Sequence, residues 1–103
     1  MTDKVGQLQL VQQNLHNIVT QKQQVETQLI ELTSAEEQLK TTQKSYKILG
    51  KMMVEVSTEK LSKDVAEKKE VLDLRLKNLS KQEENLQKNI KDLQQDVMKE
   101  MKK

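Results

Sequence analysis

The sequence has no cysteine, proline, tryptophan or phenylalanine, and Tyr46 is its single aromatic residue. Without cysteine the chain forms neither a disulfide framework nor a thiolate metal site. Only 34% of the 103 residues are apolar, too few for an ordinary globular core. No stretch approaches the ~20 apolar residues that cross a bilayer, and no signal-peptide segment begins the chain. We therefore expect a cytoplasmic protein that makes no contact with a membrane.

Catalytic chemistry has few candidates in this composition. His16 is the only histidine, and a plain surface position suits it best. No phosphate-cradling glycine loop is present, and no serine or threonine has an adjacent base. The net charge is +2 with both signs interspersed, whereas a nucleic-acid surface is more one-sided. We expect no enzymatic activity, no catalytic residue, no metal, no cofactor and no nucleic-acid partner.

Leucine, isoleucine and valine recur instead at alternating spacings of three and four in two long runs. Such a stripe marks the a and d positions of a coiled coil, and we call it the seam. Its apolar members are Leu8, Val11, Leu15, Ile18, Val25, Leu29, Leu32 and Leu39 in the first run, and Val65, Leu72, Leu76, Leu79, Leu86, Ile90, Leu93 and Val97 in the second.

Four charged residues interrupt the seam. Lys22 and Glu36 occupy it in the first run, and Lys69 and Glu83 in the second. Folding the chain back at Gly50 brings Lys22 level with Glu83 and Glu36 level with Lys69. Opposite charges then meet at two depths and disfavour slipped registers. The alternative, in which these long side chains reach past the seam to solvent, stays open.

The block at residues 45–57 has no heptad rhythm and is rich in strand-forming residues. Gly50 followed by Lys51 suits a two-residue type II′ turn. A disordered or helical bend is the alternative. We predict a mainly α fold of one domain, residues 1–103: a first coiled-coil helix over 1–44, a β-hairpin over 45–57 and a second helix over 58–103, paired antiparallel.

An isolated hairpin is marginally stable in water, and its edges are templates for pairing. Copies of the same hairpin, joined edge to edge into an intersubunit β-barrel, would solve both problems. The residues predicted to make this oligomerisation surface are Tyr46, Ile48, Leu49, Gly50, Met52, Met53, Val54 and Val56.

The hairpin segment YKILG at residues 46–50 and the stretch from LRL at 74–76 to KQEE at 81–84 are the most specific motifs. With the order helix, hairpin, helix, they resemble the β-class subunit of prefoldin. The resemblance implies a hexamer of two α-class and four β-class subunits, built on hairpin barrels. It further implies that the ends of the coiled-coil arms bind unfolded client proteins and deliver them to a group II chaperonin, without nucleotide.

Apolar residues near the two chain ends, four of them off the seam, suggest where clients bind. We call this region the tip, and its predicted residues are Val5, Leu8, Leu10, Val11, Val97, Met98 and Met101. Methionine suits an adaptable surface because its unbranched thioether conforms to many partners. Scattered surface apolar residues are the alternative reading. A structural tether or scaffold without chaperone activity is the alternative function, although a tether has no need of an apolar hairpin.

Overall fold

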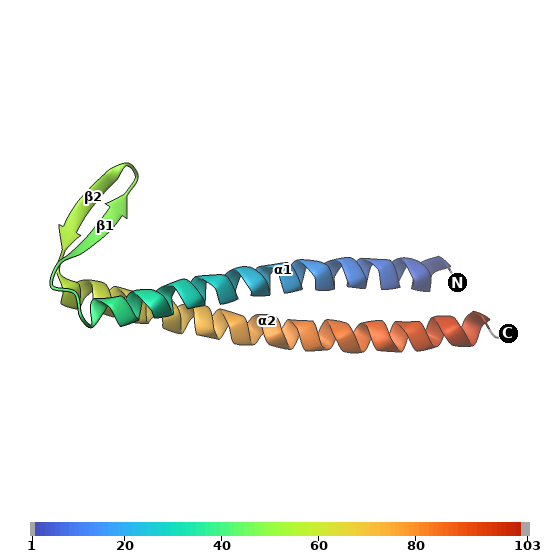
Figure 1. Ribbon diagram of the computed structural model, residues 1–103. Coiled ribbons are helices and arrows are strands. Elements are labelled where there is room, and N and C mark those ends of the chain that lie inside the picture. The colour runs from blue at the N-terminus through green and yellow to red at the C-terminus, as the bar shows by residue number, and fades with distance from the viewer. Residues whose placement is uncertain (1, 102–103) are drawn as a thin grey trace. The chain divides into compact units, whose positions relative to one another are not determined.

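The computed structural model describes residues 2–101 and consists of two long helices joined by a two-stranded hairpin (Figure 1). Helix α1 spans Thr2–Leu39, and helix α2 spans Thr58–Met101. Strands β1 and β2 span Ser45–Leu49 and Met52–Val56. Predicted helix positions 1, 102 and 103 lie outside the described residues. Within that range, neither helix combines the length and apolarity needed to span a membrane.

The chain divides into two compact units. The terminal unit holds the residues up to Gln24 and those from Leu76 onward. Here α1 and α2 run antiparallel, and Lys4 lies 3.3 Å from Glu100, so the two ends of the chain are neighbours. The hairpin unit, Val25–Arg75, holds the end of α1, both strands and the start of α2.

The predicted seam is the side of each helix that is removed from solvent. Val25 and Val65 in the hairpin unit are 2% and 7% exposed, and Leu79 in the terminal unit is 5% exposed. Every other apolar seam residue is half-buried. Full burial of such a side chain stabilises by about 1.5–3 kcal/mol, so these half-buried residues contribute less each. The heptad prediction is confirmed, and the seam is the only hydrophobic core that the described residues form.

Helix α1 ends at Leu39, before the boundary predicted at residue 44. Two threonines explain the early end. The hydroxyls of Thr41 and Thr42 donate to the carbonyl of Gln38 at 3.3 and 2.7 Å, and the Thr41 amide donates to the same carbonyl at 3.2 Å. Threonine side chains offer the backbone an alternative to continued helix, and the run of apolar residues stops here as well.

The hairpin has the predicted strands and turn. Leu49 faces Met52 across the turn, and Ser45 faces Val56 at the open end. Gly50 has φ +60°, whereas Lys51 has no positive φ. A positive φ at the first central residue alone is the signature of a type II′ turn, whose twist matches that of the strands. The alternative of a disordered or helical bend is thereby excluded.

The start of α2 is fixed by a cap and by a link to the hairpin. The amide of Lys60 donates to the hydroxyl of Ser57 at 3.4 Å, which makes Ser57 the N-cap. The hydroxyl of Thr58 instead pairs with that of Ser45 at 2.9 Å. Ser45 is buried, so this hydrogen bond links the start of β1 to the start of α2 away from solvent.

Candidate functional site

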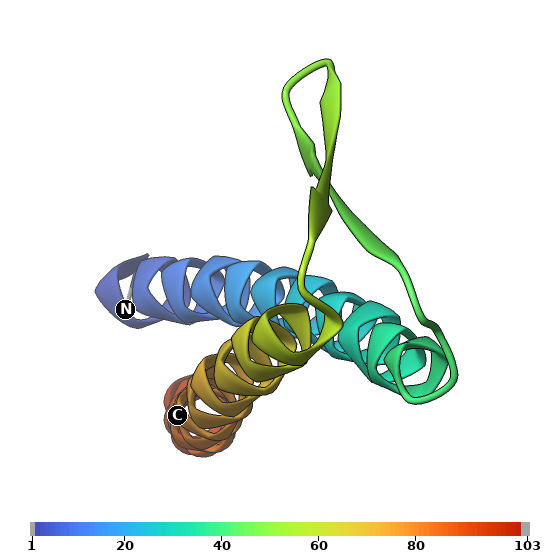
Figure 2. The ribbon, with the colours of Figure 1, turned by 90° about the vertical axis from the view of Figure 1, so that its left-hand side faces the viewer.

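The hairpin exposes apolar side chains on both of its faces. Paired strand residues point to the same side, so Leu49 and Met52 share one face while Ile48 and Met53 share the other. All four side chains are more than half exposed, and Ile48 reaches 70%. Figure 2 shows the hairpin standing away from the end of α1 and the start of α2, to which it is joined. Two exposed apolar faces on two strands form a surface that a further protein chain can cover.

At the open end of the hairpin, both faces approach the helices of the hairpin unit. Val54 and Val56 are half-buried and lie on the same face as Lys47. Lys47 also lines an open groove of about 720 Å³ with Leu61 and Val65 of α2. The open end of this face therefore lies near α2 of its own unit. On the opposite face, Tyr46 lines a second open groove with Leu39 of α1 and Leu61 of α2, whereas Ile48 stays 70% exposed.

The predicted tip residues fall into two groups. Leu8, Val11 and Val97 are half-buried members of the seam. Val5, Leu10, Met98 and Met101 are exposed, and Met101 is 79% exposed.

The four exposed tip residues do not form one patch. Counting from the seam, Val5 and Met101 occupy e positions and Met98 a b position, which lie on one flank of the helix pair. Leu10 occupies a c position on the other flank. The structure thus brings Val5, Met98 and Met101 to one side and separates Leu10 from them.

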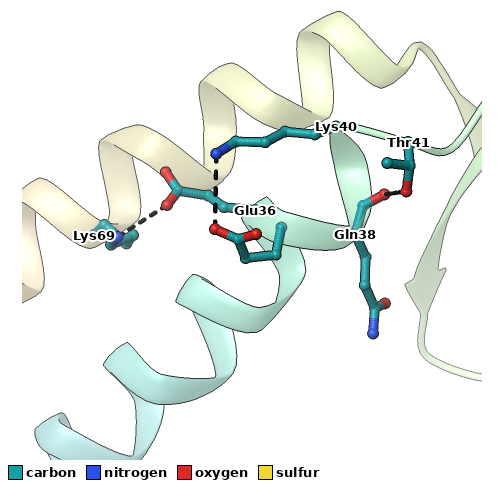
Figure 3. A network of polar contacts seen from close by, with 6 residues as sticks. Glu36, Gln38, Lys40, Thr41 and Lys69 are labelled. Carbon is teal, nitrogen blue, oxygen red and sulfur yellow. Dashed lines mark hydrogen bonds and ion pairs between the residues drawn. The ribbon is translucent and has the colours of Figure 1, made fainter.

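Ion pairs form across the seam at both of the levels predicted from the sequence. In the terminal unit, Lys22 Nζ lies 3.2 Å from Glu83 Oε1, and the two side chains are 25% and 21% exposed. In the hairpin unit, Lys69 Nζ lies 2.9 Å from Glu36 Oε1 (Figure 3). The predicted pairing is confirmed, and the alternative of side chains that simply reach to solvent is excluded.

A third seam pair was missed by the sequence reasoning. Lys4 lies four residues before Leu8, and Glu100 lies three residues after Val97, so each occupies the next seam position beyond the outermost apolar one. Lys4 Nζ lies 3.3 Å from Glu100 Oε1. Lys4 Nζ also lies 3.9 Å from Asp96. Extending the three-four spacing by one step in each run would have found it.

Exposed apolar residues also occur on the helices of the hairpin unit. Ile30, Val71 and Leu74 are each more than half exposed, and Ile30 had no place in the sequence predictions. Among the described residues, no group of three or more histidine, cysteine or acidic side chains is placed to hold a metal ion. Most of the exposed large apolar side chains lie on the hairpin and the tip, which are the candidate functional surfaces.

The family model described as "Prefoldin subunit" matches residues 2–103. The prefoldin subunit beta of Archaeoglobus fulgidus is 37% identical over 94 residues, which cover 88% of this chain and 81% of the relative. The chain belongs to the prefoldin β-subunit family. The prefoldin subunit beta of Pyrococcus horikoshii is 34% identical over 96 residues, which cover 90% of this chain and 82% of that protein.

A solved prefoldin structure has the same fold. The crystal structure of the prefoldin beta subunit from Thermococcus strain KS-1 superposes with a TM-score of 0.86 at 31% identity. The match covers 95% of this chain and 89% of the Thermococcus chain. Prefoldin is a non-enzymatic chaperone family, so the role of the chain is that of a chaperone subunit that works within a prefoldin complex.

Proposed function

We propose that the chain is an assembly and client-binding subunit of an ATP-independent holdase. Four copies join two α-class subunits through their hairpins, which close into intersubunit β-barrels. The coiled-coil tips hold unfolded proteins in the cytoplasm and pass them to a group II chaperonin.

One observation supports this proposal above the others. Nine of the twelve exposed large apolar side chains in the described residues lie on the hairpin or at the tip. An exposed apolar surface is a liability unless a partner covers it. The hairpin presents its apolar side chains on two paired strands, which suit a permanent partner, whereas the methionines of the tip suit changing ones.

Holding by the tip needs several arms at once. Each tip offers a small apolar surface, and each contact with a client is weak. Linking several weak contacts in one complex raises the overall affinity by orders of magnitude through effective concentration. The proposed hexamer therefore explains how a small exposed surface holds a whole protein.

The test measures assembly and holding in the same preparation. The chain is mixed with a candidate α-class partner and its native mass is measured, with the chain alone as reference. Denatured citrate synthase is then diluted into the complex and light scattering is followed, with serum albumin as the control protein. We expect a heteromeric mass and suppressed scattering. A tether without chaperone activity would assemble and leave the scattering unchanged.

A further inference from the structure

One flank of the terminal unit carries an open groove of about 450 Å³. Its floor consists of the half-buried seam residues Ile18 and Leu86. Its walls are side-chain amides contributed by both helices: Asn14, Asn17 and Gln21 from α1, and Gln82 and Asn85 from α2. We call it the amide groove.

The groove contains many hydrogen-bonding groups and no charge. None of its five amides has a hydrogen-bond or ion-pair partner within residues 2–101. Each amide offers two N–H donors and one carbonyl acceptor. Hydrogen-bonding capacity is thus concentrated around an apolar floor.

The opposite flank of the same helix pair differs in charge along α2. At the depth of the groove its α2 positions carry the exposed charged residues Lys77, Glu84 and Lys91, with Ser80 and Gln87 between them. Charged residues usually occupy the solvent-exposed positions of a coiled coil. On α2 the flank with the groove is thus the one without charged residues, whereas α1 carries amides on both flanks, such as Gln12 on one and Asn14 on the other.

We propose that the amide groove binds the extended main chain of an unfolded polypeptide. Each residue of an unfolded chain presents one N–H and one C=O, and amide side chains pair with both. The groove spans Asn14 to Gln21, about two helical turns or ~10 Å, which matches about three residues of extended chain. The floor of Ile18 and Leu86 accepts whichever apolar side chain the client presents.

The absence of charge explains why such a site suits a chaperone. A charged groove would select clients by the charge of their side chains. Amides instead form hydrogen bonds with the main chain, which all proteins share. This inference rests on the proposed holding function and adds a second binding surface beyond the apolar tip. It assigns recognition of the main chain to the groove and of apolar side chains to the tip.

The test removes one amide from each helix without adding charge. The amide variant carries Asn17→Ala and Asn85→Ala, and alanine is the better helix former, so folding is preserved. The control variant carries Gln12→Ala and Gln87→Ala, which are exposed on the opposite flank. A tip variant carries Met98→Ser and Met101→Ser. Each is prepared in complex with the α-class partner, and native mass checks assembly.

The probes are an uncharged, fluorescently labelled unfolded peptide and the same peptide N-methylated at alternate residues, which removes main-chain N–H groups. Binding is measured by fluorescence anisotropy. We expect the wild-type complex and the control variant to bind the parent peptide about tenfold more tightly than the methylated one, since two hydrogen bonds are at stake. The amide variant should lose that preference, and the tip variant should keep it while binding both peptides more weakly.

An amide variant that keeps the preference overturns the proposal, as does an amide variant with an altered native mass, which would make the groove a contact between subunits. If the wild-type complex suppresses aggregation but shows no preference between the peptides, the groove proposal fails and the holding function stands. If it neither binds peptide nor suppresses aggregation, the holding function fails as well.

Discussion

Lys22 and Glu83 occupy seam positions that most coiled coils fill with aliphatic side chains. Their ion pair at 3.2 Å is largely shielded from solvent, and neither group is left unpaired in the seam. Half-buried pairs of this kind contribute little net stability, because desolvation offsets the attraction. Their effect is on register, since a slip by one heptad would set Lys22 against an apolar layer.

A double-mutant cycle tests this coupling. Lys22→Glu places two acids together in the terminal unit and should lower the free energy of unfolding by about 1 kcal/mol. Adding Glu83→Lys restores opposite charges and should recover at least half of the loss. Chemical denaturation of all four proteins gives the coupling energy. A coupling of zero would mean that the two positions act independently and that register is set elsewhere.

Gly50 allows a second prediction at the scale of one residue. A Cβ added there meets no atom within 4 Å, so any cost of substitution comes from its φ of +60° alone. Gly50→Val should destabilise the turn by about 1–3 kcal/mol, because β-branched residues avoid this region. Gly50→Asn should cost much less, because asparagine tolerates it. Thermal melting of the complex should rank the proteins as glycine, asparagine, valine; equal melting temperatures would contradict the turn assignment.

At the scale of the element, the hairpin is the part of the chain with the most exposed apolar surface for its length. Ile48 lies on the same face as Met53 and is 70% exposed. Ile48→Asp should therefore leave the single chain helical. In the assembled complex it would bury an unpaired charge, at a cost of several kcal/mol, and abolish association.

Native mass and circular dichroism measure the two outcomes separately. Lys51→Asp is the matched control, because it adds the same acid at the exposed turn without removing an apolar side chain. We expect loss of the heteromeric mass in Ile48→Asp and an unchanged mass in the control. A hairpin variant that assembles normally would show that the subunits join through another surface, such as the exposed Val71 and Leu74.

The same elements show how far sequence reasoning reaches. Helix pairing was predictable because the three-four spacing repeats over many heptads, and the turn was predictable because Gly50 stands between two runs of strand formers. The end of α1 was not, since it depends on whether Thr41 and Thr42 bond to Gln38 or continue the helix, two local options of similar energy. The amide groove was also missed, because single amides on a helix surface look ordinary until both helices are placed together.

At the scale of the whole molecule, twelve large apolar side chains of the described residues stay exposed to solvent. Among the apolar side chains of the described residues, only Val25, Val65 and Leu79 are less than a tenth exposed, so internal packing alone gives a limited core. Partner association adds stability by mass action, because a partner that binds only the folded chain shifts the equilibrium toward it. We infer that the isolated chain is less stable than the chain in its complex.

Client holding is the property of the whole molecule that the tip should control. Val5, Met98 and Met101 lie on one flank at the ends of α1 and α2, and all three are exposed. Changing all three to serine should leave folding and assembly intact, since none contributes to the buried seam. Each lost apolar contact costs on the order of 1 kcal/mol or less, about fivefold in affinity at most, and the loss multiplies over the several arms that hold one client.

The measurement compares suppression of light scattering by complexes that carry the triple variant, Leu10→Ser on the other flank, or the control pair Ile30→Ser and Leu74→Ser. The control removes apolar side chains of similar exposure from the hairpin unit. We expect a large loss of protection in the triple variant, a smaller loss for Leu10→Ser and none in the control. If the triple variant protects as well as the wild type, clients are held away from the tip; equal losses in all three would instead mean that any exposed apolar residue on the helices suffices.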